Sequence, residues 1–202
     1  SQRRRCWNPC TQRIGEKVDN LIDIGLNLMH KSFRKDREEI IEEAKKVGVN
    51  QFIITGTNIN SSQLAAEYAS KYPGTLYSTS GIHPHDAKTM DEDILTLIKG
   101  LTKKEKVQAI GEIGLDFHYN HSDQNTQEYW FRRQIQLANE LKMPIVIHSR
   151  EAAKDTWDMM HALKCEDIGG VVHCYSYSVE MARNYLNKGF YLGIGGVVTY
   201  KN

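Results

Sequence analysis

Residues 144–150 read Pro-Ile-Val-Ile-His-Ser-Arg, a short apolar run that ends in polar residues. The proline closes a helical pattern around Trp130–Leu141, and three β-branched residues follow it directly. Such a run is typical of a strand in a parallel sheet that is covered on both faces. His148 stands where the apolar run stops, at the expected carboxyl end of the strand. Runs of this kind recur along the chain, and they decide the fold.

Six further strands are expected from apolar runs. They lie at residues 21–24, 51–55, 76–80, 107–111, 170–173 and 190–194. Amphipathic helical patterns lie between several of them, for example at 94–101 and 181–186. Gly48 and Gly189 follow two of the helical patterns, where a left-handed residue commonly ends a helix. The alternation predicts an α/β protein, either a (β/α)8 barrel of the TIM type or a doubly wound sheet.

The number of strands bears on the choice between these two folds. A TIM-type barrel has eight βα units and typically about 250 residues, whereas this chain has 202 residues and seven expected strands. We expect a TIM-type barrel domain over 20–202 that is truncated at its C-terminus, with about seven of the eight units. An unclosed barrel would expose two strand edges and part of its apolar interior. Residues 1–19 contain Arg3-Arg4-Arg5 and no apolar repeat, so a disordered extension is expected there.

Composition excludes some classes of protein. The 26 basic and 25 acidic residues nearly balance, so nucleic-acid binding would have to rest on a local site rather than on a strongly basic surface. No apolar run is long enough for a membrane span, and no signal-peptide core is visible. The four cysteines show no CxxC spacing, which favours free thiols. We expect a cytoplasmic protein that does not bind membranes, with the nucleus as an alternative location.

Polar side chains stand at the ends of several expected strands. Glu112, His148 and His173 each follow or end an apolar run, and His83 and His85 come shortly after the third run. The carboxyl ends of parallel strands meet at one face, so these residues are expected to converge there. Imidazole and carboxylate are suitable ligands for divalent metals. The alternative for each residue alone is a strand end satisfied by loop backbone.

Other polar residues are expected to play a smaller part. Asp23 lies inside the first apolar run, where an unpaired carboxylate would be unfavourable, so we expect it to be hydrogen-bonded or to face a metal. Four histidines are not placed by an expected strand end, and we assign them no role in the site: His30, His118, His121 and His161.

Six motifs, in order along the chain, resemble those of the TatD-like deoxyribonucleases. They are Ile22-Asp23-Ile24-Gly25-Leu26-Asn27-Leu28, Thr55-Gly56-Thr57-Asn58, Gly81-Ile82-His83-Pro84-His85, Gly111-Glu112-Ile113-Gly114-Leu115-Asp116, Pro144-Ile145-Val146-Ile147-His148-Ser149-Arg150 and Val172-His173-Cys174-Tyr175. The resemblance covers about residues 21–200. It implies a metal-dependent hydrolase of the amidohydrolase-like TIM-barrel superfamily that cleaves DNA, often from the 3′ end of single strands. Mg²⁺ is the cofactor that it implies first, with Mn²⁺ or Zn²⁺ as alternatives.

The resemblance also assigns roles to residues. By position, Glu112, His148 and His173 match metal ligands of the family. His83 matches a residue that lines the substrate cleft, and Arg150 a neighbour of the scissile phosphate. The expected catalytic residues are therefore Glu112, His83 and Arg150. His83, His85 and Arg150 are expected to bind substrate.

The chain departs from the family pattern at two places. Many members carry His-x-His after the first Asp, whereas this chain has Gly25 and Asn27, so Asn27 is expected to be a weaker oxygen ligand of the metal. The Glu-Thr-Asp-x-Pro motif of the eighth strand has no counterpart before Asn202. The general base that the family takes from that motif is therefore not expected in this chain.

The function expected from these observations is a metal-dependent deoxyribonuclease, with single-stranded DNA or DNA 3′ ends as its partner. Two alternatives stay open. The same scaffold could hydrolyse a small ester or amide, because a fold does not fix a substrate. The chain could also be a catalytically inactive truncated form. We expect a monomer for a full-length form of the protein.

Overall fold

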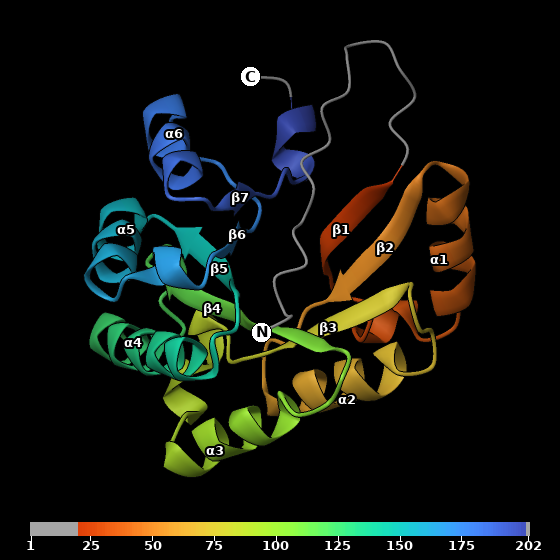
Figure 1. The fold of residues 1–202 in the computed structure, drawn as a ribbon, viewed down its shortest axis with the longest axis horizontal. Helices are drawn as coiled ribbons and strands as arrows, with labels where there is room; N and C mark the ends of the chain where they lie inside the picture. The colour runs from red at the N-terminus through yellow and green to blue at the C-terminus, as the bar shows by residue number, and fades with distance from the viewer. Residues whose placement is uncertain (1–19, 201–202) are drawn as a thin grey trace.

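The computed structural model describes residues 20–200, so the extension expected at 1–19 lies outside the described residues. One seven-stranded sheet forms the centre of the fold, with the strands in the order β1 to β7 and every neighbouring pair parallel. The strands are β1 (Leu21–Leu26), β2 (Val49–Ile54), β3 (Leu76–Ser80), β4 (Val107–Asp116), β5 (Ile145–Arg150), β6 (Gly170–Val172) and β7 (Tyr191–Leu192). The sheet curls, with β1 and β7 as its outer strands (Figure 1).

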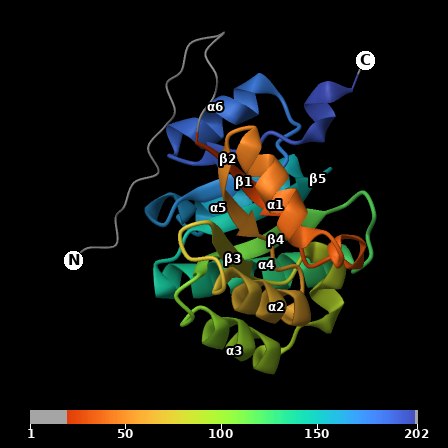
Figure 2. The ribbon, with the colours of Figure 1, turned by 90° about the vertical axis from the view of Figure 1, so that its right-hand side faces the viewer.

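Helices connect the strands and cover the outside of the sheet (Figures 1 and 2). They are α1 (Arg37–Lys46), α2 (Ile59–Ala69), α3 (Glu92–Leu101), α4 (Gln124–Leu141), α5 (Ala153–Ala162) and α6 (Val179–Asn187). A 3-10 helix, η2 (Pro84–Thr89), lies between β3 and α3. Sequential strand order confirms the TIM-barrel type of fold, since a doubly wound sheet reverses its strand order at a switch point.

Side chains of the central strands alternate between two apolar clusters. Ile145 and Ile147 of β5 pack with Phe131 and Ile135 of α4 in the larger cluster, on the helix side of the sheet. Val146, between them, belongs to a small cluster with Ala109, Val171 and Ile24. Because successive side chains of a strand point to opposite faces, this second cluster lies on the concave face of the sheet. A curled sheet has little room there, and small side chains fill it.

Helix ends follow the expected signals. Gly48 and Gly189 adopt positive φ angles of 99° and 79°, just after α1 and α6. Helix α4 ends at Leu141, where Lys142 takes a left-handed conformation two residues before Pro144. None of the helices between residues 20 and 200 has the length and apolar character needed to cross a bilayer.

The observed strands differ from the expected ones mainly at β4. This strand continues five residues beyond the expected end at 111, and all of its residues from Ala109 to Asp116 are buried. The added segment stays paired with β5, with Gly114 opposite His148 and Asp116 opposite Arg150. Pairing with β5 therefore extends β4 beyond the glycines at which the sequence pattern predicts that it ends.

The outer strands carry exposed apolar side chains, as expected for an unclosed barrel. Leu21 and Ile22 of β1 and Tyr191 of β7 are each more than a third exposed. Ile194, just after β7, is 73% exposed. In a closed barrel such positions would be paired or covered.

Candidate active site

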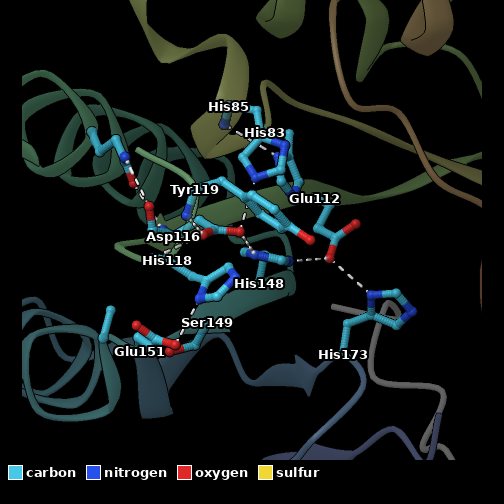
Figure 3. Close-up of polar contacts among 12 residues, drawn as sticks. His83, His85, Glu112, Asp116, His118, Tyr119, His148, Ser149, Glu151 and His173 are labelled. Carbon is cyan, nitrogen blue, oxygen red and sulfur yellow. Dashed lines mark hydrogen bonds and ion pairs between the residues drawn. The ribbon is translucent and has the colours of Figure 1, made fainter. Parts of the chain in front are cut away.

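The carboxyl ends of the central strands bring the predicted site residues together. Glu112 lies in β4 and His148 in β5, while His173 directly follows β6 and His83 lies in the loop after β3. One ligand atom from each of His83, Glu112 and His148 lies within 4.8 Å of the others. The side chains of His83, His148 and His173 surround Glu112 (Figure 3). The expected convergence of strand ends is therefore observed.

Glu112 is the centre of this cluster. Its Oε1 accepts hydrogen bonds from His173 Nδ1 at 2.8 Å and from His148 Nδ1 at 3.3 Å. The residue is 6% exposed. Burial by itself would raise the pKa of the Glu112 carboxyl, but the hydrogen bonds from His148 and His173 outweigh it and hold the pKa well below the usual range. Glu112 is thus a buried anion whose charge is balanced by imidazoles.

Asp116 is a second buried carboxylate, which the sequence analysis did not select. Its Oδ2 accepts hydrogen bonds from His148 Nε2 at 2.9 Å and from His85 Nε2 at 2.8 Å. Burial opposes ionisation, yet the backbone hydrogen bond from Tyr119 and those from His85 and His148 lower the pKa of Asp116 to about 2. Alternation of Ile113 and Leu115 before it was the signal that β4 continues to this residue.

His148 links the two carboxylates, and His173 contacts the first. Burial alone would lower the pKa of each imidazole. For His148, hydrogen bonds to Glu112 and Asp116 reverse this effect and raise the pKa. For His173, contacts with Cys174 and Glu112 raise the pKa to about 10. Both shifts favour the protonated imidazoles beside the two carboxylates.

His83 has the opposite electrostatic character. Burial and the neighbouring His148 lower the pKa of His83 to about 3, so its ring is neutral at physiological pH. Its Nδ1 accepts a hydrogen bond from the backbone N–H of His85 at 3.2 Å. A neutral imidazole that accepts at Nδ1 carries its proton on Nε2. His83 therefore has an N–H that can donate to a substrate.

Three other residues named from the sequence lie outside the group formed by His83, Glu112 and His148. Arg150 is exposed, and its Cζ lies 4.7 Å from the ring centroid of Tyr119. Asn27 is exposed in the loop after β1, where its backbone carbonyl accepts from the N–H of His30 at 3.1 Å. Asp23 accepts a hydrogen bond from the N–H of Gly25 at 3.0 Å. This agrees with the first of its two expected roles, a hydrogen-bonded carboxylate.

Two histidines that were assigned no role lie beside the site. His118 Nδ1 is 2.7 Å from Glu151 Oε1, and the His121 ring centroid is 4.7 Å from that of His85. Both belong to the segment that follows β4. Because β4 extends to Asp116, this segment begins at the rim of the site, and the absence of a role for these two residues stays a prediction.

The donor set fits a divalent cation. One carboxylate and neighbouring imidazole nitrogens meet at a partly buried point, a combination that transition-metal ions and Zn²⁺ prefer, while a carboxylate with water suits Mg²⁺. The second carboxylate, on Asp116, orients His148 in the way that residues behind a metal site commonly do. A curled parallel α/β sheet with this cluster at its strand ends defines a metal-dependent hydrolase of the barrel class.

Comparison with known proteins specifies the family. A family model described as TatD related DNase matches residues 22–202, and the chain belongs to this family. An uncharacterized metal-dependent hydrolase, YabD of Bacillus subtilis (strain 168), is 40% identical over 182 residues, which are 90% of this chain and 71% of that protein. The 3′-5′ ssDNA/RNA exonuclease TatD of Pantoea sp. (strain At-9b) is 39% identical over 178 residues, which are 88% of this chain and 68% of that protein.

Solved structures agree with this assignment. YJJV, a TatD homolog from Escherichia coli k12, superposes with a TM-score of 0.82 at 26% identity and covers 89% of this chain and 69% of that chain. A TatD family hydrolase from Entamoeba histolytica has a TM-score of 0.78 at 29% identity, covering 89% of this chain and 66% of that chain.

Proposed function

We propose that the protein is a metal-dependent exonuclease that removes nucleotides from the 3′ end of single-stranded DNA. The observation that carries the proposal is the buried Glu112 carboxylate at the carboxyl ends of the strands. One of its oxygens accepts hydrogen bonds from both His148 and His173. The exonuclease name of the Pantoea relative, at 39% identity, supports the polarity and the single-stranded substrate. The same name includes RNA, so RNA is the second substrate to be tested.

Glu112, His148 and His173 are proposed to hold the cation, with Asn27 as a further oxygen donor. A bound divalent cation would polarise the phosphodiester and lower the pKa of a water molecule. Mg²⁺ is the proposed ion, and the imidazoles make Mn²⁺ and Zn²⁺ the alternatives.

The chain's own residues are proposed to bind and orient the phosphodiester. The N–H at Nε2 of His83 would donate to a phosphate oxygen, since this ring is neutral and its Nδ1 is already occupied. The guanidinium of Arg150 would hold a neighbouring phosphate, for which its fork of donors is suited. His85 is fixed against Asp116 and would line the substrate side of the site. The hydrogen bond from Nε2 to Asp116 orients His148, and its Nδ1 faces Glu112.

The test uses an oligonucleotide labelled at its 5′ end, incubated with Mg²⁺, Mn²⁺ or Zn²⁺ and with a chelator control. We expect a ladder of products shortened from the 3′ end, which disappears with chelator and in Glu112→Gln and His148→Ala. Glu39→Gln, an exposed glutamate on α1, is the matched control and should cleave like the wild type.

Three results would contradict the proposal. Full activity in both Glu112→Gln and His148→Ala would remove the assigned site. A folded protein that cleaves no oligonucleotide but hydrolyses small esters or amides would favour the alternative substrate class. A folded protein that does neither would favour an inactive form. Cytoplasmic location and a monomeric state for a full-length form stay predictions.

A further inference from the structure

Tyr119 is an exposed aromatic side chain at the rim of the candidate active site. It is 50% exposed, although it lies only three residues after the buried Asp116. Its ring is parallel to that of His121, with an interplanar angle of 4° and a centroid distance of 5.6 Å. The edge contact with His85 is 5.5 Å between centroids. Figure 3 shows the Tyr119 ring above Asp116, with its hydroxyl pointing toward the Glu112 side of the view.

One carboxylate fixes the position of Tyr119 relative to the catalytic cluster. Asp116 Oδ1 accepts the backbone N–H groups of His118 and Tyr119, at 3.1 Å and 3.0 Å. Its other oxygen, Oδ2, accepts from His85 and His148. The loop that carries Tyr119 and the rings that line the site are therefore held by the two ends of the same buried anion. An aromatic surface held in this way loses little conformational freedom when a ligand stacks on it.

A positive charge accompanies this aromatic surface. The guanidinium of Arg150 lies over the Tyr119 ring, at 4.7 Å from its centroid. Arg150 is two residues after His148 in β5, so both side chains leave the strand on the same face. Sites for single-stranded nucleic acid combine aromatic rings, on which bases stack, with cationic groups that track the phosphates. Arg150 and Tyr119 provide both elements next to the proposed cleavage point.

We propose that Tyr119, with Arg150 against its ring, is the stacking site for a nucleobase next to the phosphodiester that is hydrolysed. The inference rests on the proposed exonuclease function and adds to it the feature that selects the substrate. A base inside a duplex has both faces covered by its neighbours, whereas an unpaired base of a single strand can turn a face to Tyr119. A small ester or amide without a ring gains nothing from this surface.

Oligonucleotide binding tests the inference without catalysis. Binding of a fluorescent single-stranded oligonucleotide is measured by anisotropy in the presence of chelator. Tyr119→Ala is expected to weaken binding by roughly 5- to 150-fold, the range for loss of one stacked base. Tyr119→Phe retains the ring and should bind like the wild type. Tyr129→Ala, an equally exposed tyrosine on the outer helix α4, is the matched control and should also bind normally.

Cleavage kinetics supply the second measurement. With the metal present, Tyr119→Ala should raise KM for a normal oligonucleotide much more than it lowers kcat. For an oligonucleotide whose terminal residues lack bases, wild type and Tyr119→Ala should be equal, because there is no base to stack. Circular dichroism melting confirms that each variant is folded.

The outcomes separate this inference from the proposed function. Cleavage by the wild type with equal binding and KM in Tyr119→Ala would overturn the stacking site and leave the exonuclease proposal standing. Binding that depends on the Tyr119 ring in a protein that does not cleave would support the stacking site and contradict the exonuclease. Loss of binding in Tyr119→Phe as well as in Tyr119→Ala would assign the effect to the hydroxyl and overturn the stacking role.

Discussion

Gly25 of β1 lies against the imidazole of His173, so closely that a Cβ on Gly25 would stand 1.9 Å from His173 Nε2. The other nitrogen of His173 contacts Glu112 at 2.8 Å. The ring therefore fills the space between the outer strand and the central carboxylate. Any side chain at position 25 would require His173 to move, which gives a structural reason for glycine at this place in the motif.

Gly25→Ala is predicted to damage the site more than the fold. The added methyl group would displace the ring of His173, a proposed metal ligand, from Glu112, and loss of an orienting contact at a metal site typically lowers activity or metal affinity by about 10- to 100-fold. Thermal unfolding should change little, because His173 is part-exposed and can rotate outward. The measurements are metal-dependent cleavage and the melting temperature.

Gly100→Ala is the matched control for this change. Gly100 is in α3, and a Cβ added there meets nothing within 4 Å. This variant should keep full activity and should gain stability, by roughly 0.5–1 kcal/mol, because alanine favours a helix over glycine. Normal metal affinity in Gly25→Ala would show that His173 does not need its present position.

Gln134 of α4 carries a second prediction, on stability. Its side chain accepts from the backbone N–H of Ile82 at 2.8 Å and donates to the carbonyl of the same residue at 3.1 Å. The Gln134 side chain thus makes the two backbone hydrogen bonds that a neighbouring strand would otherwise make with the segment before His83. Gln134→Leu would leave two buried backbone groups without partners, at roughly 1–3 kcal/mol for each. Urea unfolding measures the difference.

The exposed Gln136, on the same helix, supplies the control for this experiment. Gln136→Leu should change the free energy of unfolding by less than about 0.5 kcal/mol. If Gln134→Leu were as stable as Gln136→Leu, the two hydrogen bonds to Ile82 would not contribute to the stability of the fold.

The sequence was sufficient to predict the strands and the part of the site that stands directly at their ends. Apolar runs stop at His148 and His173, and a strand end in a parallel sheet fixes where its next side chain lies. Asp116 was missed for a physical reason. The expected strand ends at Gly111, and Glu112 and Gly114 interrupt the apolar residues between it and Asp116. In the structure Gly114 instead permits close approach of β5, where a Cβ would lie 1.9 Å from the carbonyl oxygen of His148.

Contacts between segments that are distant in the sequence could also not be predicted from the sequence pattern. Gln134 and Ile82 are 52 residues apart, and nothing in the helical pattern of α4 indicates that this glutamine points inward. The aromatic neighbours of Tyr119 depend in the same way on β4 being longer than its apolar run. Such residues are placed by tertiary packing, which overrides the local pattern.

Cys165 carries the prediction on pH. This thiol follows α5 and is fully buried, and burial together with the nearby Glu166 raises its pKa from the usual 9.0 to about 12. Cys174, by contrast, is exposed. Iodoacetamide at pH 8 should therefore modify Cys174 in the folded protein and reach Cys165 only after denaturation. Peptide mass spectrometry distinguishes the two sites.

Cys165 should also weaken the fold at alkaline pH, with a sign that follows from its raised pKa. Between pH 9 and about 12 the unfolded chain releases this proton while the folded protein retains it. Since the folded state then binds more protons, its stability is complete below pH 9 and falls as pH rises, by at most about 1.4 kcal/mol per pH unit.

Urea unfolding at pH 8 and pH 10 should show a smaller loss of stability in Cys165→Ala than in the wild type. The tyrosines that titrate in this range are common to both proteins and cancel in the comparison. Equal losses in the two proteins would mean that the Cys165 thiol ionises in the folded state as readily as in the unfolded chain.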